Sequence, residues 1–386
     1  MDFFHTSQAL RREFRAHKSD VKRRAKGFLK HDYLVPAGPY EEQWDWDAFF
    51  IGVALLSDVP SEAVFLKNWA LNYLEHVNAK TGFTPGLLTP KGIDTRLNHI
   101  KPFLAQGIYI AARALADFSW IQSHFATLQK SIAYREKHLW SQKYGLGMWY
   151  DSMESGADNN VAALDFPKGT VVGTDLNTFL YREYQAMAKI ARALGKVRNT
   201  AIWTKKAQQL KRNINKYLWN AQDATYYNLD SRTGQHIKRH SYSNVLPLWG
   251  GLATPAAGKK MIKKYVLNPQ KLWAKHGIRT LAKDDPEYNN RNMIKPHSNW
   301  QGPVWPIANY LYIHGLLNYG FVREARVAAQ RVMENCLRDI AASGGMHENY
   351  HADTGKALAA PNFVSWNLLL GLLAEDITAV RNPFRL

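Results

Sequence analysis

The sequence predicts an all-α protein in which six helical hairpins close into a ring, an (α/α)6 barrel. Apolar residues recur about every 3.6 positions through most of the chain, which is the spacing of an amphipathic helix. The connections between the expected helices alternate between very short turns and long segments rich in Gly, Pro, Trp and Asp. Such hairpins place their long loops on one face of the ring, and loops on a rigid scaffold often carry function.

The periodicity predicts about twelve helices. They are expected at 5–29, 45–57, 60–79, 101–116, 119–141, 176–194, 198–219, 241–250, 254–266, 302–318, 320–342 and 362–377. The 386 residues give each hairpin about 64, and we expect one domain over residues 1–386. An open α-solenoid is the structural alternative, but it normally shows a sequence repeat, and none is apparent. A small β-hairpin is expected at Tyr226 and Tyr227, with its turn at 231–234.

The long loops are expected at 30–47, 81–107, 143–177, 267–301 and 343–366. The last of them contains a carboxylate, Glu348. Gly344 and Gly345 end the helix before it, and Gly355 and Pro361 prevent a new helix from starting at once. Glu348 is therefore expected on a structured loop between two helices.

The composition allows a large core with aromatic residues left over. The chain is 46% hydrophobic and contains 13 Trp and 19 Tyr. Tryptophan and tyrosine fill cores well, but tryptophans beside carboxylates in loops also form platforms on which the C–H faces of sugar rings pack. The aromatic loops therefore favour a sugar-binding site.

The formal net charge is +18, and basic residues crowd the first expected helix. They are Arg11, Arg12, Arg15, Lys18, Lys22, Arg23, Arg24, Lys26 and Lys30. No nucleic-acid-binding motif accompanies this charge, and a solvated basic helix face is the simpler explanation. We therefore expect neither nucleic acid nor a membrane as a partner.

Cysteine usage and hydropathy indicate the compartment. Cys336 is the only cysteine, which excludes an intramolecular disulfide and a cysteine metal cluster. The N-terminal residues lack the apolar stretch of a signal peptide, and no segment reaches the roughly 18 apolar residues of a transmembrane helix. A cytoplasmic protein is the expectation.

Three carboxylates, Asp151, Glu154 and Asp158, lie together in the third long loop. A solvated turn or a helix cap is the ordinary use of such residues, and their spacing does not match a calcium loop. The remaining use pairs one acid from this loop with Glu348. Hydrolysis of a glycosidic bond needs two carboxyl groups, one to protonate the leaving oxygen and one to activate water or attack the sugar.

Five segments make the chain similar to glycoside hydrolase family 63, and more distantly to the trehalases of family 37. They are DYLVPAGPYEEQWDWDAFF, ESGADNN, GTDLNTFLYRE, NWQGPVWPIANYLYIHGL, and HENYHADTG followed by FVSW; they stand in the family's order, and the resemblance covers about residues 31–375. The resemblance implies an inverting α-glycosidase with an (α/α)6 catalytic barrel. It makes Asp158 the general acid and Glu348 the general base that activates water.

The resemblance and the aromatic loops also suggest residues that bind the sugar. They are Tyr40, Trp44, Trp46, Asp47, Gln106, Asp175, Trp300, Gly302, Trp305, His347, Tyr350 and Trp366. Several of these residues have a structural alternative. Trp305 and Trp366 could belong to the barrel core, Gln106 could cap a helix, and Asp175 could be the N-cap of a helix. His347 is an orienting or structural residue, or alternatively a catalytic one.

Two departures leave the substrate open. Gln301 stands where family members usually have arginine, and Asn299 where enzymes that hydrolyse glycosylglycerates tend to have tyrosine. The expected substrate is a small α-glucoside, a disaccharide or a glucosylglycerate-like compound. An α-mannoside such as a mannosylglycerate, or trehalose, is the alternative substrate.

Two other classes of protein remain as alternatives. One is an inert sugar-binding barrel, and the other is a sugar 2-epimerase, which would use histidines such as His297, His347 and His351. For the hydrolase we expect no metal and no organic cofactor. Neighbouring carboxylates and burial are expected to raise the pKa of Asp158, with Glu348 ionised, and inversion requires the two carboxyl groups to be about 6.5–9.5 Å apart.

Overall fold

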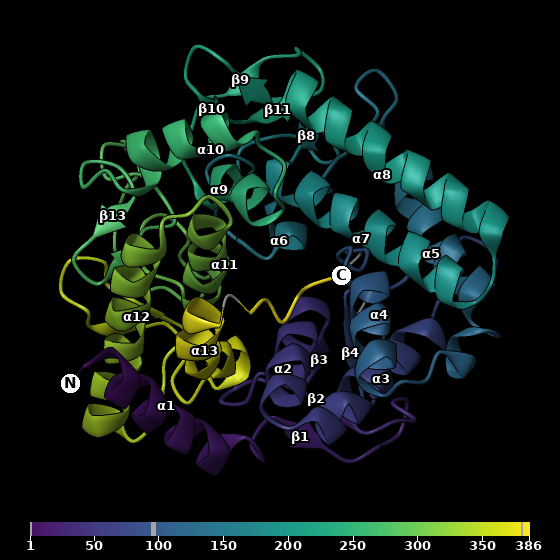
Figure 1. Cartoon of the computed structure of the whole chain (residues 1–386), viewed down its shortest axis with the longest axis horizontal. Helices are drawn as coiled ribbons and strands as arrows, with labels where there is room; N and C mark the ends of the chain where they lie inside the picture. The colour runs from purple at the N-terminus through teal and green to yellow at the C-terminus, as the bar shows by residue number, and fades with distance from the viewer. Residues whose placement is uncertain (1, 94–97, 380) are drawn as a thin grey trace.

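The computed structural model describes residues 2–93, 98–379 and 381–386 and shows a closed ring of helices (Figure 1). The inner ring consists of α2 (Asp45–Asp58), α4 (Leu104–Ala114), α7 (Thr174–Ala193), α9 (Tyr242–Trp249), α11 (Pro306–Asn318) and the 3-10 helix Ser365–Leu372. Each of these elements contacts the next, and the last contacts α2, so the ring closes. The predicted (α/α)6 barrel is confirmed.

An outer layer of helices surrounds this ring. It contains α1 (Phe3–His17), α3 (Ala63–Leu74), α5 (Phe125–His138), α8 (Val197–Tyr217), α10 (Pro255–Met261) and α12 (Val322–Ser343). The two layers differ in burial. Outer helix α8 buries only Trp203, Ala207, Leu210 and Ile214, which form one stripe, whereas inner helix α11 buries every residue from Pro306 to Leu316.

Short antiparallel strands lie in the loops between the helices. Three-stranded sheets contain β3 (Gln43–Trp44), β4 (Leu87–Thr89) and β5 (Gly92–Ile93), and β8 (Val171–Val172), β11 (Asn228–Asp230) and β12 (His236–Ile237). Pairs are formed by β1 (Lys22–Arg23) with β2 (Tyr33–Leu34), β6 (Trp140–Ser141) with β7 (Leu146–Gly147), β9 (Trp219–Asn220) with β10 (Thr225–Tyr226), β13 (Trp273–Ala274) with β14 (Gly277–Ile278), and β15 (Asn349–Tyr350) with β16 (Ala357–Leu358). The predicted hairpin is present, with its turn between β11 and β12.

Several helix boundaries differ from the prediction. The first helix ends at His17 rather than at residue 29, because the following residues turn back and pair as β1 with β2. The predicted helix 254–266 changes to a π-helix at Ile262–Val266. The last predicted helix is a 3-10 helix followed by α13 (Leu373–Thr378), and the unpredicted short helix α6 (Ser152–Ser155) lies in the third loop. Residues 94–97 of the second loop lie outside the described residues.

Some of the basic residues of the N-terminal region lie along a seam between helices, while others, such as Arg12, Arg24 and Lys26, are exposed. Helix α1 packs against α12 and the 3-10 helix Ser365–Leu372. Arg11 and Arg15 both pair with Asp58 at the end of α2, and Lys18 and Lys22 pair with Glu62. Four of the basic residues of this region therefore pair with two acidic side chains, one at the end of the first inner helix and one in the turn after it.

The C-terminal tail enters the interior of the ring (Figure 1). The ring of Phe384 lies 5.6–6.0 Å from those of Phe50, Trp249 and Tyr310, which belong to three different inner helices. Arg182 of α7 donates a hydrogen bond to the Phe384 carbonyl. The tail thus contributes to the hydrophobic core inside the barrel. Within the described part of the chain, the helices lack the length and apolar character needed to cross a membrane.

Candidate active site

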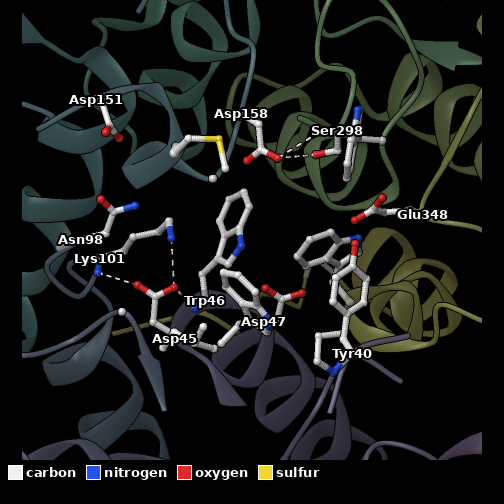
Figure 2. Close-up of a pocket in the computed structure, with 18 of the residues that line it drawn as sticks. Tyr40, Asp45, Trp46, Asp47, Asn98, Lys101, Asp151, Asp158, Ser298 and Glu348 are labelled. Carbon is white, nitrogen blue, oxygen red and sulfur yellow. Dashed lines mark hydrogen bonds and ion pairs between the residues drawn. The ribbon is translucent and has the colours of Figure 1, made fainter. Parts of the chain in front are cut away.

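A cavity of about 420 Å³ opens among the loops at one end of the inner ring (Figure 2). This size falls in the range of about 300–1,000 Å³ that is typical of small-molecule sites. It is lined by Pro36, Tyr40, Trp44, Asp45, Trp46, Asp47, Gly86, Leu87, Asn98, His99, Lys101, Tyr150, Asp151, Met153, Gly156, Asp158, Lys168, Ile294, Ser298, Trp305, Glu348, Phe363 and Trp366. Segments from across the whole sequence therefore meet in one cavity.

The first turn of α2 brings two aspartates to the cavity. Acidic residues are favourable in this position because they face the positive end of the helix dipole. Asp45 is committed to Lys101: its carboxylate accepts from the backbone N–H of that residue at 2.7 Å and pairs with the Nζ at 3.0 Å. Asp47 accepts one hydrogen bond from the Ser365 hydroxyl at 3.0 Å, and burial raises its pKa to about 7. Asp47 is therefore the aspartate of this pair that can hold a sugar hydroxyl.

Asp158 follows α6 and the left-handed Gly156, whose φ is 79°. A Cβ at Gly156 would lie 2.6 Å from the ring of Trp46, so glycine permits the loop to approach α2. The Oδ2 of Asp158 accepts from the Ser298 amide at 3.1 Å and from the Ser298 hydroxyl at 2.7 Å (Figure 2). Burial raises the pKa of Asp158, whereas these hydrogen bonds and the charge of Lys101 oppose the rise. The predicted direction is confirmed, but burial rather than neighbouring carboxylates causes it.

Glu348 faces the same cavity from the loop between α12 and β15 (Figure 2). It is buried, and its Oε2 has no hydrogen-bond partner among the described residues. Burial, followed by the charges of Asp158 and Asp47, raises its pKa to about 8, and a hydrogen bond from Tyr40 opposes the rise. The expectation of an ionised Glu348 at neutral pH therefore does not hold while the other two carboxylates are charged. Asp47, Asp158 and Glu348 share one cavity, so their three carboxyl groups cannot all ionise easily.

A cluster of four tryptophans forms and supports the floor of the cavity. Trp46 lies 5.4 Å from Trp366 and 6.1 Å from Trp300, and Trp300 stacks on Trp305 at 4.1 Å. Trp305 is fixed by a 2.7 Å hydrogen bond from its Nε1 to the Asn299 carbonyl. Of the four, Trp46, Trp305 and Trp366 line the cavity, while Trp300 supports them from behind. The floor offers the aromatic faces on which a sugar ring packs.

The structure brings eight of the predicted site residues to the cavity lining. They are Tyr40, Trp44, Trp46, Asp47, Asp158, Trp305, Glu348 and Trp366. Three of the others are buried in the walls. Gln106 donates to the carbonyls of Pro102 and Phe179, and Asp175 accepts from the Trp149 indole and the Ser243 hydroxyl. Trp300, as described above, stacks behind the lining.

The remaining three predicted residues shape nearby loops. Gly302 has a φ of 149°, and a Cβ there would lie 2.3 Å from the Asn289 carbonyl oxygen, so it allows two loops to pass closely. His347 and Tyr350 both hydrogen-bond to Asp339 of α12. None of the three lines the cavity.

Sequence reasoning missed several lining residues, of which Ser298 and Lys101 have the clearest effects. Ser298 donates twice to Asp158, and Lys101 places a positive charge beside Trp46, with its Nζ 5.3 Å from that ring. Serine and lysine are common in loops, and neither carries a local signal of its role. Only the packing of loops that lie more than 50 positions apart brings these residues to the site.

The positions of the histidines and of the potential metal ligands give little support to an epimerase or to a metal site in this cavity. His297, His347 and His351, which an epimerase would use, are not among the lining residues. His99 does line it, but its Nδ1 accepts a hydrogen bond from the Thr84 amide, and burial lowers its pKa well below the usual range. The described residues contain no group of three potential metal ligands placed to hold an ion.

Solved structures share this fold. A glycoside hydrolase family 63 mannosylglycerate hydrolase from Thermus thermophilus, in complex with Tris and D-glycerate, aligns with a TM-score of 0.73 and 17% identity, covering 95% of this chain and 100% of that chain. Neutral trehalase Nth1 from Saccharomyces cerevisiae aligns with a TM-score of 0.66 and 16% identity, covering 91% of this chain and 76% of the other. At such identities the likeness concerns the fold alone.

Sequence comparison supplies the class and the family. A mannosylglycerate hydrolase from Rubrobacter radiotolerans is 25% identical over 201 residues, which is 52% of this chain and 43% of the relative. A cytosolic neutral trehalase from Pyricularia oryzae is 25% identical over 197 residues, 46% of this chain and 26% of the relative. The chain thus matches less than half the length of either relative. Together with the fold, these similarities define a glycoside hydrolase.

The family follows from a match over most of the chain. Residues 40–366 match the family described as mannosylglycerate hydrolase MGH1-like glycoside hydrolase domain, and the protein belongs to this family. The resemblance to glycoside hydrolase family 63 that the motifs predicted is thereby confirmed.

Proposed function

We propose that the protein hydrolyses a small α-glycoside with inversion of the anomeric centre, using Asp158 as general acid and Glu348 as general base. The observation that supports this most strongly is the convergence of two carboxyl groups, the half-buried Asp158 and the buried Glu348, from loops far apart in sequence on one cavity. Their surroundings differ, as the two roles require: Asp158 accepts hydrogen bonds, while one oxygen of Glu348 is left for a ligand.

The hydrogen bonds from Ser298 determine which oxygen of Asp158 carries a proton. The serine amide and hydroxyl both donate to Oδ2, so a proton on Asp158 occupies Oδ1. We assign Oδ1 as the atom that protonates the leaving oxygen. Glu348 then accepts a proton from the water that attacks the opposite face of the sugar.

Glu348 can act as a base because its pKa depends on its neighbours. The charges of Asp158 and Asp47 contribute to the raised pKa of about 8. When Asp158 is protonated, one of these like charges disappears and Glu348 ionises more easily. The productive state therefore carries one proton on the acid and none on the base.

The lining suggests how a substrate lies in the cavity. The tryptophan floor and Asp47 suit the glycone, and Asn98, Lys101 and Asp151 suit the aglycone at the opposite side of Asp158 (Figure 2). A small α-glucoside or α-mannoside fits these features. The name of the matched family supports a mannosylglycerate-like substrate, and the trehalase relatives support trehalose as the second candidate. We also propose a cytoplasmic location, consistent with Cys336 being unpaired and buried.

The test is monosaccharide release from a panel of trehalose, kojibiose, glucosylglycerate, mannosylglycerate and other α-glucosides and α-mannosides. We expect hydrolysis of at least one of these compounds, with a large loss in Asp158→Asn and Glu348→Gln. Full activity in both variants would exclude the assigned pair, and sugar binding without release would indicate an inert binding protein. NMR of the first sugar released should show the β-anomer, whereas initial α-anomer would contradict inversion.

A further inference from the structure

A single carboxylate on an outer helix holds the residues on both sides of Glu348. Asp339 lies near the C-terminal end of α12 and is only 6% exposed. Its Oδ2 accepts from the backbone N–H of His347 at 2.7 Å and from the hydroxyl of Tyr350 at 3.0 Å. The Nδ1 of His347 lies 3.0 Å from the same oxygen, and the Ser343 hydroxyl donates to Oδ1 at 3.0 Å.

The residues that Asp339 contacts flank the proposed general base, Glu348, in the sequence. His347 immediately precedes Glu348, and Tyr350 follows it by two residues. The loop begins at the left-handed Gly344, and Glu348 itself has one backbone anchor, from its N–H to the Ala360 carbonyl at 3.1 Å. The side chain of Glu348 receives a hydrogen bond from Tyr40, but its Oε2 is unpaired among the described residues. Anchoring of the adjacent residues therefore helps to fix its position.

The chemistry of the cluster suits a rigid anchor. Hydrogen bonds to an ionised carboxylate are roughly twice as strong as those between neutral groups, and Asp339 collects its donors in a buried environment. Burial and the neighbouring Cys336 and Asp339 raise the pKa of Tyr350 well above its usual value, so the hydroxyl remains a donor. The backbone of Tyr350 also exchanges hydrogen bonds with Val304 at 2.7 and 2.9 Å, which ties the loop to the segment before α11.

We propose that Asp339 is the positioning residue of the general base, acting through His347 and Tyr350. This inference rests on the proposed function, in which Glu348 must hold water against the sugar. It gives a role to His347 and Tyr350 of the HENY segment, which lie outside the cavity lining. A displacement of about 1 Å in a catalytic group can cost on the order of 10²-fold in rate, so an anchor of this kind affects turnover more than binding.

The test compares Asp339→Ala, Asp339→Asn and the control Glu334→Gln, which changes another acidic residue of α12 that is partly exposed and, among the described residues, forms no hydrogen bond or ion pair with the Glu348 loop. For each protein, kcat, KM, the pH profile of kcat and the Kd of the monosaccharide product are measured at a temperature where all are folded. We expect Asp339→Ala to lower kcat about 30- to 100-fold with KM and Kd within about threefold of wild type. Asp339→Asn, which retains an acceptor oxygen, should recover part of the loss, and the control should match wild type.

A double-mutant cycle separates positioning from general stability. Asp339→Ala and Tyr350→Phe both remove the hydrogen bond between these two side chains, so their effects on kcat should be clearly less than additive. The inference is overturned if Asp339→Ala retains kcat within about threefold of wild type, or if kcat, product affinity and melting temperature decline together. Activity of Glu348→Gln distinguishes the two proposals: an inactive Glu348→Gln beside a normal Asp339→Ala rejects only the positioning role, whereas an active Glu348→Gln rejects the proposed mechanism.

Discussion

The loops that carry Asp158 and Glu348 are held in opposite ways. Asp158 is fixed at its carboxyl group, where the amide and hydroxyl of Ser298 donate to one oxygen. The carboxyl group of Glu348 receives a hydrogen bond from Tyr40 and its loop is held through the neighbouring residues, while one of its carboxyl oxygens has no partner among the described residues. The difference shows how one scaffold can prepare two similar groups for two tasks, because a proton donor needs a defined oxygen and a base needs a free one.

The largest effect should come from removing each carboxyl group in turn. We expect Asp158→Asn and Glu348→Gln to lower kcat by about 10²–10⁴-fold on a natural glycoside, the usual contribution of general acid–base catalysis. An activated aryl α-glycoside sharpens the comparison, since its leaving group needs little protonation. On that substrate, Asp158→Asn should recover most of its activity and Glu348→Gln should not. Equal recovery in both variants would contradict the separate roles.

The raised pKa of Glu348 also predicts that the free energy of unfolding depends on pH. The pKa of Glu348 is about 8 in the folded protein and about 4.5 when unfolded, so the folded state binds more protons between these pH values. The free energy of unfolding should therefore fall as the pH rises from about 4.5 to about 8. In Glu348→Gln this decline should be smaller, making the variant the more stable protein at pH 8. Chemical denaturation at several pH values measures the slope, and an unchanged slope would contradict this origin.

The two loops contain glycines with the same backbone conformation and different surroundings. Gly156 and Gly344 both have a φ of 79°, but a Cβ would lie 2.6 Å from Trp46 at the first and would meet no atom within 4 Å at the second. We expect Gly344→Ala to lower the free energy of unfolding by about 1 kcal/mol from backbone strain alone. Gly156→Ala should cost about 1–3 kcal/mol more and reduce kcat as well. Thermal unfolding and activity assays check both, and equal losses would show that the contact with Trp46 is unimportant.

The smallest effect should appear in the pH dependence of kcat/KM in the variant Ser298→Ala. The hydroxyl of Ser298 favours the charged form of Asp158, so its loss should raise the pKa of the acid further. The alkaline limb of the kcat/KM profile should move upward by about one pH unit, which corresponds to the roughly 1.5 kcal/mol of a hydrogen bond to a charged group. Ser298→Thr keeps the hydroxyl and should behave like wild type. A downward shift in Ser298→Ala would contradict the assignment of Asp158 as the acid.

The architecture could be predicted from the sequence because the apolar periodicity of each helix is a local property of its residues. The narrow apolar stripe of α8 and the largely apolar sequence of α11 agree with their places in the outer and inner layers. Local propensity was misleading at residues 18–29, where strand pairing and ion pairs with Glu62 replace the predicted helix. The boundaries of helices and strands thus depend on tertiary contacts that cannot be predicted from apolar periodicity.

The candidate site was predictable only in part for a similar reason. The glycine-framed loop and the family motifs indicate Asp158 and Glu348. They do not indicate Ser298 or Asp339, whose importance arises only from what they touch. Conversely, Gln106 and Asp175 stand in motif segments but are bonded within the barrel wall. A sequence motif contains both residues that contact a ligand and residues that support them, and it does not distinguish the two.

The tryptophan floor has a kinetic consequence. Trp46 packs on Phe50 at 6.0 Å, and Phe50 packs on Phe384 of the C-terminal tail, so aromatic rings fill the barrel below the cavity. A sugar lying on this floor can depart only toward the loops, after the other half of the substrate has gone. Products should leave in a fixed order, with the aglycone first. The released sugar should then inhibit competitively against substrate, and the aglycone should give a mixed pattern.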